Sequence, residues 1–297
     1  MKKYFIAVIL LSVQILAQTA GESGLAFLKN GFGARNIAMS DLGVISANDI
    51  SALHYNPALL GLNDTPELTF SHNSLFQDLS SEMVGAGFNM FGLPFAFGVN
   101  TTSISNIEIR TRPGDPEGKF NANYFYGSMS SAIKLSENIY GGVTFKYIYE
   151  NLYSDEANGY AFDFGLAYEN IIKGLSIGAA LKNIGSMNAL RNISTQLPND
   201  LRAGANYEIN LNHFVINATT GIQKYFQEDV IHYHAGAEAV YNETFALRIG
   251  YASGYDSKIL SFGFGVMLKN FRTDYAYVPV KFGLGDSHII TLIYTFN

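Results

Sequence analysis

The histidines His232 and His234 are the side chains of this sequence that are best spaced for metal binding, because residues two apart on a strand share one face. No neighbouring Asp, Glu or His completes a four-ligand set, so a structural role is favoured. Asp155, Asn158 and Gly159 weakly resemble a calcium loop, but the Asp-x-Asp spacing is missing and an outer loop is the better interpretation. We therefore predict no metal site and no cofactor.

The sequence lacks the motifs that, in the right structural context, place a nucleophile, a catalytic metal or a nucleotide. It has no His-Glu-x-x-His, no P-loop and no Gly-x-Gly-x-x-Gly, and its Gly-x-Ser-x-Gly match at 174–178 opens a predicted strand instead of forming an elbow between a strand and a helix. It also has no Cys, which excludes a disulfide scaffold, a thiolate zinc site and a catalytic Cys. Its 19 Lys and Arg against 25 Asp and Glu give a net charge of −6, without the basic stripe that nucleic-acid binding needs. The sequence predicts a protein that is not an enzyme and binds no nucleic acid.

The composition points to a membrane instead. Aromatic residues make up 14% of the chain and charged residues 15%, whereas about 25% charged residues is typical of soluble domains. So few charges indicate that part of the surface does not face water.

The first 17 residues resemble a secretory signal peptide. Lys2 and Lys3 precede an apolar run over 5–13, and Ile15-Leu16-Ala17 is a plausible cleavage site. The apolar run is shorter than the roughly 20 residues that a membrane-spanning helix needs, which argues against an anchor. We predict that residues 1–17 are removed on export.

The rest of the chain alternates apolar and polar residues with a period of two, which predicts β-strands. Fourteen strands are expected, at 66–73, 82–91, 93–109, 120–134, 137–151, 156–169, 174–184, 199–208, 213–224, 231–241, 244–253, 258–269, 271–279 and 286–297. Their connections alternate between short and long, as in barrels that span the outer membrane. The final strand places Ile290, Leu292, Tyr294 and Phe296 on one face close to the C-terminus, which also fits such a barrel.

An antiparallel barrel of about 14 strands over 66–297 follows, because a membrane-spanning sheet must close to leave no unpaired edge. A barrel of this width is too wide for its own side chains to fill. Residues 18–65, rich in Gly, Ala, Ser and Asn, are the candidate hatch in the lumen, a periplasmic tail being the alternative. Charges of both signs are expected to face inward and hold hatch to wall: Lys146, Glu150, Asp163, Glu169, Lys182, Arg202, Glu208, Glu238, Arg248, Lys269, Arg272 and Asp274.

Two N-terminal segments resemble the signature of the PorV/PorQ family, a branch of the FadL-like outer-membrane barrels. They are Gly31-Phe32-Gly33-Ala34-Arg35-Asn36-Ile37-Ala38-Met39 and Ala47-Asn48-Asp49-Ile50-Ser51-Ala52-Leu53-His54-Tyr55-Asn56-Pro57-Ala58. Leu181-Lys182-Asn183-Ile184-Gly185 and Leu197-Pro198-x-x-Leu201-Arg202-x-Gly204 are similar to later landmarks of the family. The chain departs from the family at Ser40-Asp41-Leu42 and at Leu59-Leu60. The resemblance implies a hatch whose structural motif comprises Gly33, Ala34, Arg35, Met39, Asn56, Pro57 and Ala58.

The even strand count predicts that both chain termini are periplasmic. The resemblance implies two alternative functions, both in the outer membrane of a Gram-negative cell. PorV-like members are accessory parts of type IX secretion that bind exported proteins bearing a C-terminal signal domain and work with a translocon barrel. More distant FadL-like members take up long-chain fatty acids or other hydrophobic small molecules. The export accessory is the main prediction and needs a cleft on the outer loops around 110–119 and 185–198. The channel is the alternative, as is a purely structural barrel. A channel needs an apolar lining, for which Leu53, Leu59, Leu60 and Leu62 are candidates, and a wall break near Pro94 or Gly141-Gly142.

Overall fold

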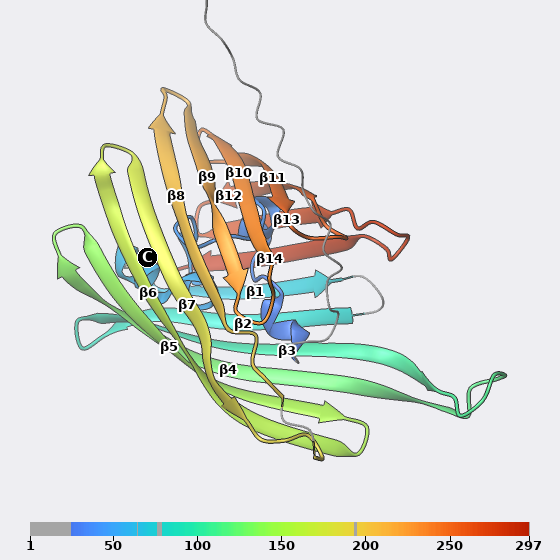
Figure 1. Cartoon of the computed structure of the whole chain (residues 1–297). Helices are drawn as coiled ribbons and strands as arrows, with labels where there is room; N and C mark the ends of the chain where they lie inside the picture. Colours follow the sequence, from blue (N-terminus) through green and yellow to red (C-terminus); the bar gives the residue numbers. More distant parts are fainter. Residues whose placement is uncertain (1–24, 64, 76–78, 193–194, 297) are drawn as a thin grey trace, which may run out of the picture.

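The protein is a closed antiparallel barrel of 14 strands, which confirms the predicted fold class (Figure 1). The structure is a computed structural model that describes residues 25–63, 65–75, 79–192 and 195–296, so the predicted signal peptide lies outside the described residues. Each strand pairs with the next along the chain, and β1 closes the barrel on β14 through Glu67 opposite Thr295. The strands are β1 (Glu67–Ser74), β2 (Leu79–Met90), β3 (Leu93–Ile109), β4 (Gly118–Ser136), β5 (Ile139–Leu152), β6 (Asp155–Ile172), β7 (Leu175–Met187), β8 (Asp200–Asn210), β9 (Phe214–Tyr225), β10 (Ile231–Tyr241), β11 (Phe245–Ser253), β12 (Leu260–Leu268), β13 (Phe271–Val278) and β14 (Ser287–Thr295).

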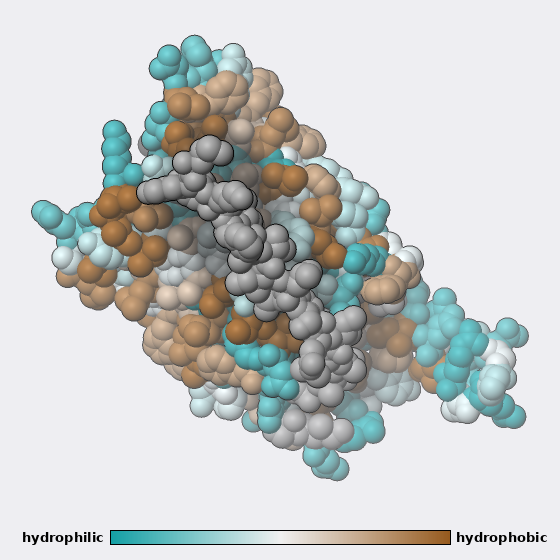
Figure 2. Space-filling model, turned by 45° about the horizontal axis from the view of Figure 1, so that its top comes forward, coloured by the Kyte–Doolittle hydropathy of each residue, from teal (hydrophilic) through white to brown (hydrophobic). Residues whose placement is uncertain are grey.

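The period of two gives the wall an apolar outer face and a mixed inner face. On β11, for example, Phe245, Leu247 and Ile249 are exposed, whereas Ala246 and Arg248 are buried. Figure 2 shows apolar side chains over much of the visible face and polar ones gathered at its projecting ends. Across the described part of the chain, no helix is both long and apolar enough to cross a bilayer.

The connections define two ends of the barrel. At the short-turn end only two or three residues join the strands, for example 91–92 between β2 and β3. The long-loop end carries 110–117, 188–199, 226–230, 254–259 and 279–286, and the β3–β4 hairpin extends well beyond its neighbours (Figure 1). One predicted outer loop is wrong: β5 and β6 join through Tyr153 and Ser154 alone, and Asp155, Asn158 and Gly159 belong to β6.

Residues 25–63, which we term the hatch, pack inside the barrel against the inner face of the wall. They contain the 3-10 helices η1 (Ala26–Lys29) and η2 (Pro57–Leu62) and the short helices α1 (Ala34–Ala38) and α2 (Ala52–Tyr55). Helix α1 contacts β11 to β14, whereas η2 contacts β3 to β6, so the hatch crosses the lumen. Its apolar side chains are almost completely buried, for example Leu42 and Leu53 at 0% exposure.

The described chain enters the barrel near the long-loop end. Lys29 of η1 forms a 2.8 Å ion pair with Glu228 of the β9–β10 loop, and Phe27 stacks on Tyr124 of β4. At the other extreme, the amide of Phe296 donates to the carbonyl of Pro66 at the short-turn end. The periplasmic position of both termini stays a prediction.

Candidate functional site

The interface between hatch and wall is built on glycines that let two backbones touch. A Cβ on Gly142 of β5 would overlap the backbone of Pro57 and Ala58, and one on Gly165 of β6 would overlap the Asn56 side chain. Gly142 and Gly165 lie opposite each other in the sheet. Only glycine permits such close approach, so these two residues form the seat of the Asn56-Pro57-Ala58 segment.

Asn56 fixes this segment by three hydrogen bonds. Its Nδ2 donates to the carbonyl of Val44 at 2.7 Å and to that of Leu166 of β6 at 3.0 Å, and its Oδ1 accepts from the Ala58 amide. The last bond caps η2, whose first residue is Pro57, a residue that needs no amide partner there. Asn56 therefore joins two parts of the hatch to each other and to the wall.

Asn56→Ala is expected to lower the free energy of unfolding by about 1–3 kcal/mol, because two buried carbonyls lose their donor. Urea titration in lipid vesicles measures the change. Asn210→Ala is the control, since Asn210 is exposed and its Nδ2 donates to Glu208 at the short-turn end. Equal stability of both variants would contradict the anchoring role of Asn56.

Across the lumen, a ladder of charges starts and ends on the hatch. Arg35 of α1 pairs with Glu238 of β10 at 2.7 Å, and Glu238 pairs with Arg248 of β11 at 2.6 Å. Arg248 continues to Asp274 of β13 at 2.7 Å. The ladder then passes to Arg272, which pairs with Asp274 at 2.8 Å and returns to the hatch at Asp49. Every member except Arg272 has a side chain that is at most 6% exposed, so the ladder binds the hatch at two points in a water-poor setting.

Burial alone would raise the pKa of the Asp49 carboxyl, but the Arg272 guanidinium lowers it, with help from the Ser51 hydroxyl and Arg35. The net direction is downward, so Asp49 stays ionised and the ladder is complete at neutral pH. Of the inward charges expected from the sequence, Glu238, Arg248, Arg272 and Asp274 form this ladder. Glu208 and Lys269 are instead exposed near the short-turn end, beyond the hatch.

The predicted hatch motif is divided between these two anchors. Gly33 is the N-cap of α1 with a φ of 82°, the Ala34 amide donates to Thr291 of β14 at 2.8 Å, and Met39 lies against Gly236 of β10. With Arg35 they form the β10–β14 anchor, whereas Asn56, Pro57 and Ala58 form the β5–β6 anchor. Of the candidate lining residues, Leu53, Leu59 and Leu60 fill the buried core and Leu62 is 37% exposed. Their role as a ligand lining stays a prediction.

A polar cluster near the Asn56 anchor joins three of the expected inward charges, Lys146, Asp163 and Lys182, to Asn183 and His54, which the sequence did not place there. A β-bulge between β6 and β7 turns both Lys182 and Asn183 inward, with Asn183 at a φ of 58°. Lys146 pairs with Asp163 at 2.6 Å and donates to Asn183 at 2.9 Å, while Lys182 Nζ lies 3.4 Å from His54 Nε2 of α2. The sequence feature that could have indicated this bulge is Asn183 in the family landmark, because Asn tolerates the left-handed backbone conformation.

Burial, and then the charges of Lys182, Lys146 and Arg202, hold the pKa of the His54 imidazole well below its usual 6.5. His54 is thus neutral when folded and gains a proton more readily when unfolded. Stability is therefore expected to fall as pH drops below about 6.5, by at most about 1.4 kcal/mol per pH unit. Unfolding in urea between pH 7 and 5 measures this slope. His54→Gln should reduce it and the exposed His213→Gln should not; a slope unchanged by His54→Gln would contradict the assignment.

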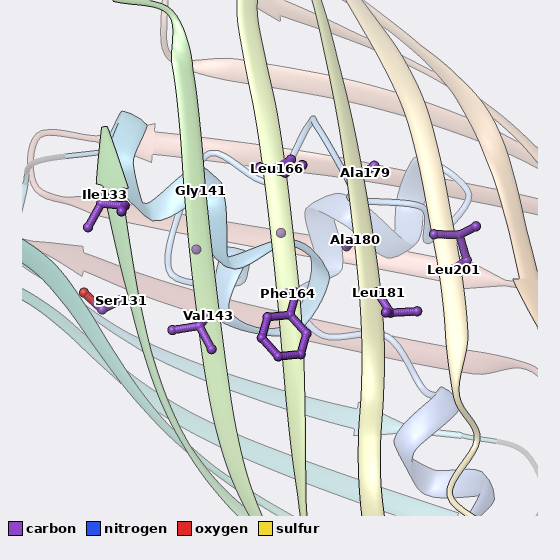
Figure 3. Close-up of a pocket in the computed structure, with 12 residues that line it drawn as sticks. Ser131, Ile133, Gly141, Val143, Phe164, Leu166, Ala179, Ala180, Leu181 and Leu201 are labelled. Atoms are coloured by element: carbon purple, nitrogen blue, oxygen red, sulfur yellow. The ribbon is translucent and has the colours of Figure 1, made fainter. Parts of the chain in front are cut away.

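On the membrane-facing side of the same wall lies a depression of about 540 Å³, directly outside the Asn56 anchor (Figure 3). Gly141 and Ala179 form its floor, with Val143, Phe164 and Leu166 among the larger apolar residues around it. We term it the groove. The β5–β6 register is continuous, and the β4–β5 register shifts between Lys134 and Ser136 but stays paired at Gly141 and Gly142, so the wall break expected there for a channel is wrong. The wall is instead thinned, because Gly142 and Gly165 place no side chain between groove and hatch.

No protein-family model matches the chain, and no curated protein matches its sequence. Solved structures do match its fold. The toluene transporter TodX of Pseudomonas putida aligns with a TM-score of 0.62 at 13% identity, over 90% of this chain and 97% of that one. The CymD monoaromatic hydrocarbon channel gives 0.62 at 13% identity, over 93% and 99%. A FadL homologue of Pseudomonas aeruginosa gives 0.55 at 12% identity, over 90% and 98%. The chain has the FadL-like outer-membrane β-barrel fold.

This FadL-like barrel matches those structures over 90–93% of the chain. Identities this low establish the fold and leave the function to the residues of this chain. Membership of the PorV/PorQ branch stays a prediction.

Proposed function

We propose that this protein is a non-enzymatic channel for the uptake of hydrophobic small molecules. The observation that carries the proposal is its likeness in fold, over almost the full chain, to a toluene transporter and a monoaromatic hydrocarbon channel. The comparisons thus favour the alternative function drawn from the sequence over the export accessory.

The lumen adds support of its own. Buried apolar side chains of the hatch and of β2 to β7 form one continuous cluster, from Met187 near the long-loop end to Tyr140 near the short-turn end. The charged pair of Lys146 and Asp163 lies beside it, with Lys146 Nζ 5.9 Å from the centroid of the Tyr126 ring. An apolar seam that connects the two ends is suited to hydrocarbon solutes and unsuited to ions or sugars. Because hatch residues fill the seam, conduction requires that part of the hatch move.

The outer loops do not match the cleft expected of an export accessory. Residues 110–117 form the exposed tip of a projecting hairpin, where Arg110 pairs with Glu108. The end of the second loop folds inward instead, since Leu197 and Pro198 are buried and the Pro198 carbonyl accepts from Asn183. The two loops predicted to form one binding surface therefore have different environments.

Uptake by whole cells tests the proposal, because the polar outer leaflet of the intact outer membrane retards hydrophobic solutes. The protein is expressed in a Gram-negative host that has no FadL-like barrels of its own. Radiolabelled toluene, a labelled long-chain fatty acid and labelled sucrose are then added to separate samples of these cells. We expect the initial uptake of at least one apolar solute to rise several-fold over cells with an empty vector, and that of sucrose to stay unchanged.

A variant with 110–117 replaced by a two-residue turn separates the two functions. A channel keeps its uptake in this variant. No gain in uptake of either apolar solute, at surface levels verified by antibody, would overturn the channel. Recovery from detergent extracts of exported proteins with a shared C-terminal domain, lost in the loop variant, would establish the export role instead.

A further inference from the structure

The groove is a concave apolar feature set within an otherwise convex wall. Its residues come from five neighbouring strands, β4 to β8, and form two rows in Figure 3. The upper row contains Ile133, Gly141, Leu166 and Ala179, so small and large side chains alternate across the strands. Gly141 lies opposite Ile133 on β4 and Leu166 on β6. The floor is low because Gly141 and Ala179 project no further than a methyl group.

The groove offers a ligand almost nothing to hydrogen-bond. Its one polar side chain is Ser131, whose hydroxyl already donates to the Pro94 carbonyl at 2.9 Å. No charged residue lines it. A bound molecule must therefore present hydrocarbon alone, and about 540 Å³ is within the roughly 300–1,000 Å³ of ordinary ligand pockets.

The surroundings of the groove identify its occupant. Val143, Phe164, Leu166 and Leu201 around it are 42%, 49%, 55% and 43% exposed, and they are part of the apolar outer face that meets the bilayer. The groove is thus continuous with the lipid-facing surface and opens into it. The hydrocarbon present there at the highest concentration is the acyl chain of a membrane lipid.

We propose that the groove is a binding site for one acyl chain of an outer-membrane lipid. The site is independent of transport and holds for any function of the barrel. The chain lies across β4 to β8 over Gly141 and Ala179, and only the backbone of β5 and β6 separates it from Asn56-Pro57-Ala58 of the hatch.

The preference for this site over the rest of the wall is modest. A chain gains no hydrophobic free energy when it moves from the bilayer into the groove, because both are apolar. It gains van der Waals contacts with the floor and the sides, each of which is weak on its own. Because only a few such contacts are gained, we expect an affinity on the order of threefold above that of the rest of the outer face.

The absence of Trp from the chain permits a direct test. Phe164→Trp places a reporter at the groove, and Phe264→Trp on β12 is the matched control, because the two Phe residues are 49% and 48% exposed. Each full-length variant, in dodecyl maltoside, is titrated with dioleoylphosphatidylcholine brominated at its double bonds, which quenches Trp on contact. The quenching midpoint at Phe164→Trp is expected about threefold below that at Phe264→Trp.

The second part of the experiment fills the floor of the groove with a larger side chain. Ala179→Leu in the Phe164→Trp background should bring the midpoint to the control value, while Ala179→Leu beside Phe264→Trp should change nothing. Equal midpoints in the two single variants, or a difference that survives Ala179→Leu, would overturn the proposal. Relief of quenching at Phe164→Trp alone by added toluene at equimolar lipid would assign the groove to a solute instead, and would also overturn it.

Discussion

Glu238→Ala is expected to destabilise the protein by about 3–5 kcal/mol, because it leaves the buried Arg35 and Arg248 guanidinium groups without their shared partner. Glu238 is the only carboxylate that binds both α1 of the hatch and β11 of the wall among the described ion pairs. Arg248 retains Asp274, so the larger loss falls on Arg35 and on the hatch. Urea unfolding in lipid vesicles measures the cost.

Glu238→Gln separates charge from shape, since the amide keeps the volume and one acceptor oxygen. It should lose less than Glu238→Ala and more than Glu208→Gln, an exposed carboxylate on β8 whose removal should change stability by under about 0.5 kcal/mol. A loss of under about 1 kcal/mol for Glu238→Ala would show that the ladder does not hold the hatch.

Strand positions could be predicted wherever one face of the wall meets apolar surroundings and the other does not. The ranges 93–109 and 231–241 match β3 and β10 to the residue. The outer-loop interpretation of Asp155, Asn158 and Gly159 is wrong, because β5 and β6 stay paired as far as Leu152 opposite Asp155 at the long-loop end. There Asp155 pairs with Arg191 and Tyr149 donates to Glu156, and the period of two vanishes from the sequence while the pairing continues.

The hatch anchors show a different limit of sequence reasoning. The motif residues could be named from a resemblance, but their partners are far away in sequence: Arg35 meets Glu238 and Asn56 meets Leu166. The alternation along each strand predicts which charged side chains face the lumen. It does not say which strand faces which part of the hatch. The Lys182-Asn183 bulge reverses parity locally, so no period could have placed both side chains in the lumen.

Gly142 and Gly141 provide a matched test and control for the role of the thinned wall. They are neighbours in the sequence, but they face opposite sides of the wall. Gly142→Val would push the Pro57-Ala58 backbone away from β5, whereas Gly141→Val adds its side chain on the membrane side, near the flexible end of Leu135. Overpacking of this kind costs about 1–3 kcal/mol, and the rigid backbone behind Gly142 offers little room to relax. We expect the hatch to detach locally at this anchor in Gly142→Val alone.

Ala58→Cys reports the detachment, because the chain has no other Cys and Ala58 is 0% exposed. In the Gly142→Val background, maleimide should modify Cys at this position at least about tenfold faster, the factor that corresponds to a 1.4 kcal/mol shift toward the open state. The Gly141→Val background should retain the slow rate of the parent. Equal rates in the two backgrounds would mean that the hatch is not seated on Gly142, whereas fast modification in the parent itself would mean that the seat is open without any substitution. The expected difference between the two labelling rates follows from geometry. Only one backbone layer separates hatch from bilayer here, so a valine side chain on its inner side displaces the hatch, whereas a valine side chain on its outer side does not.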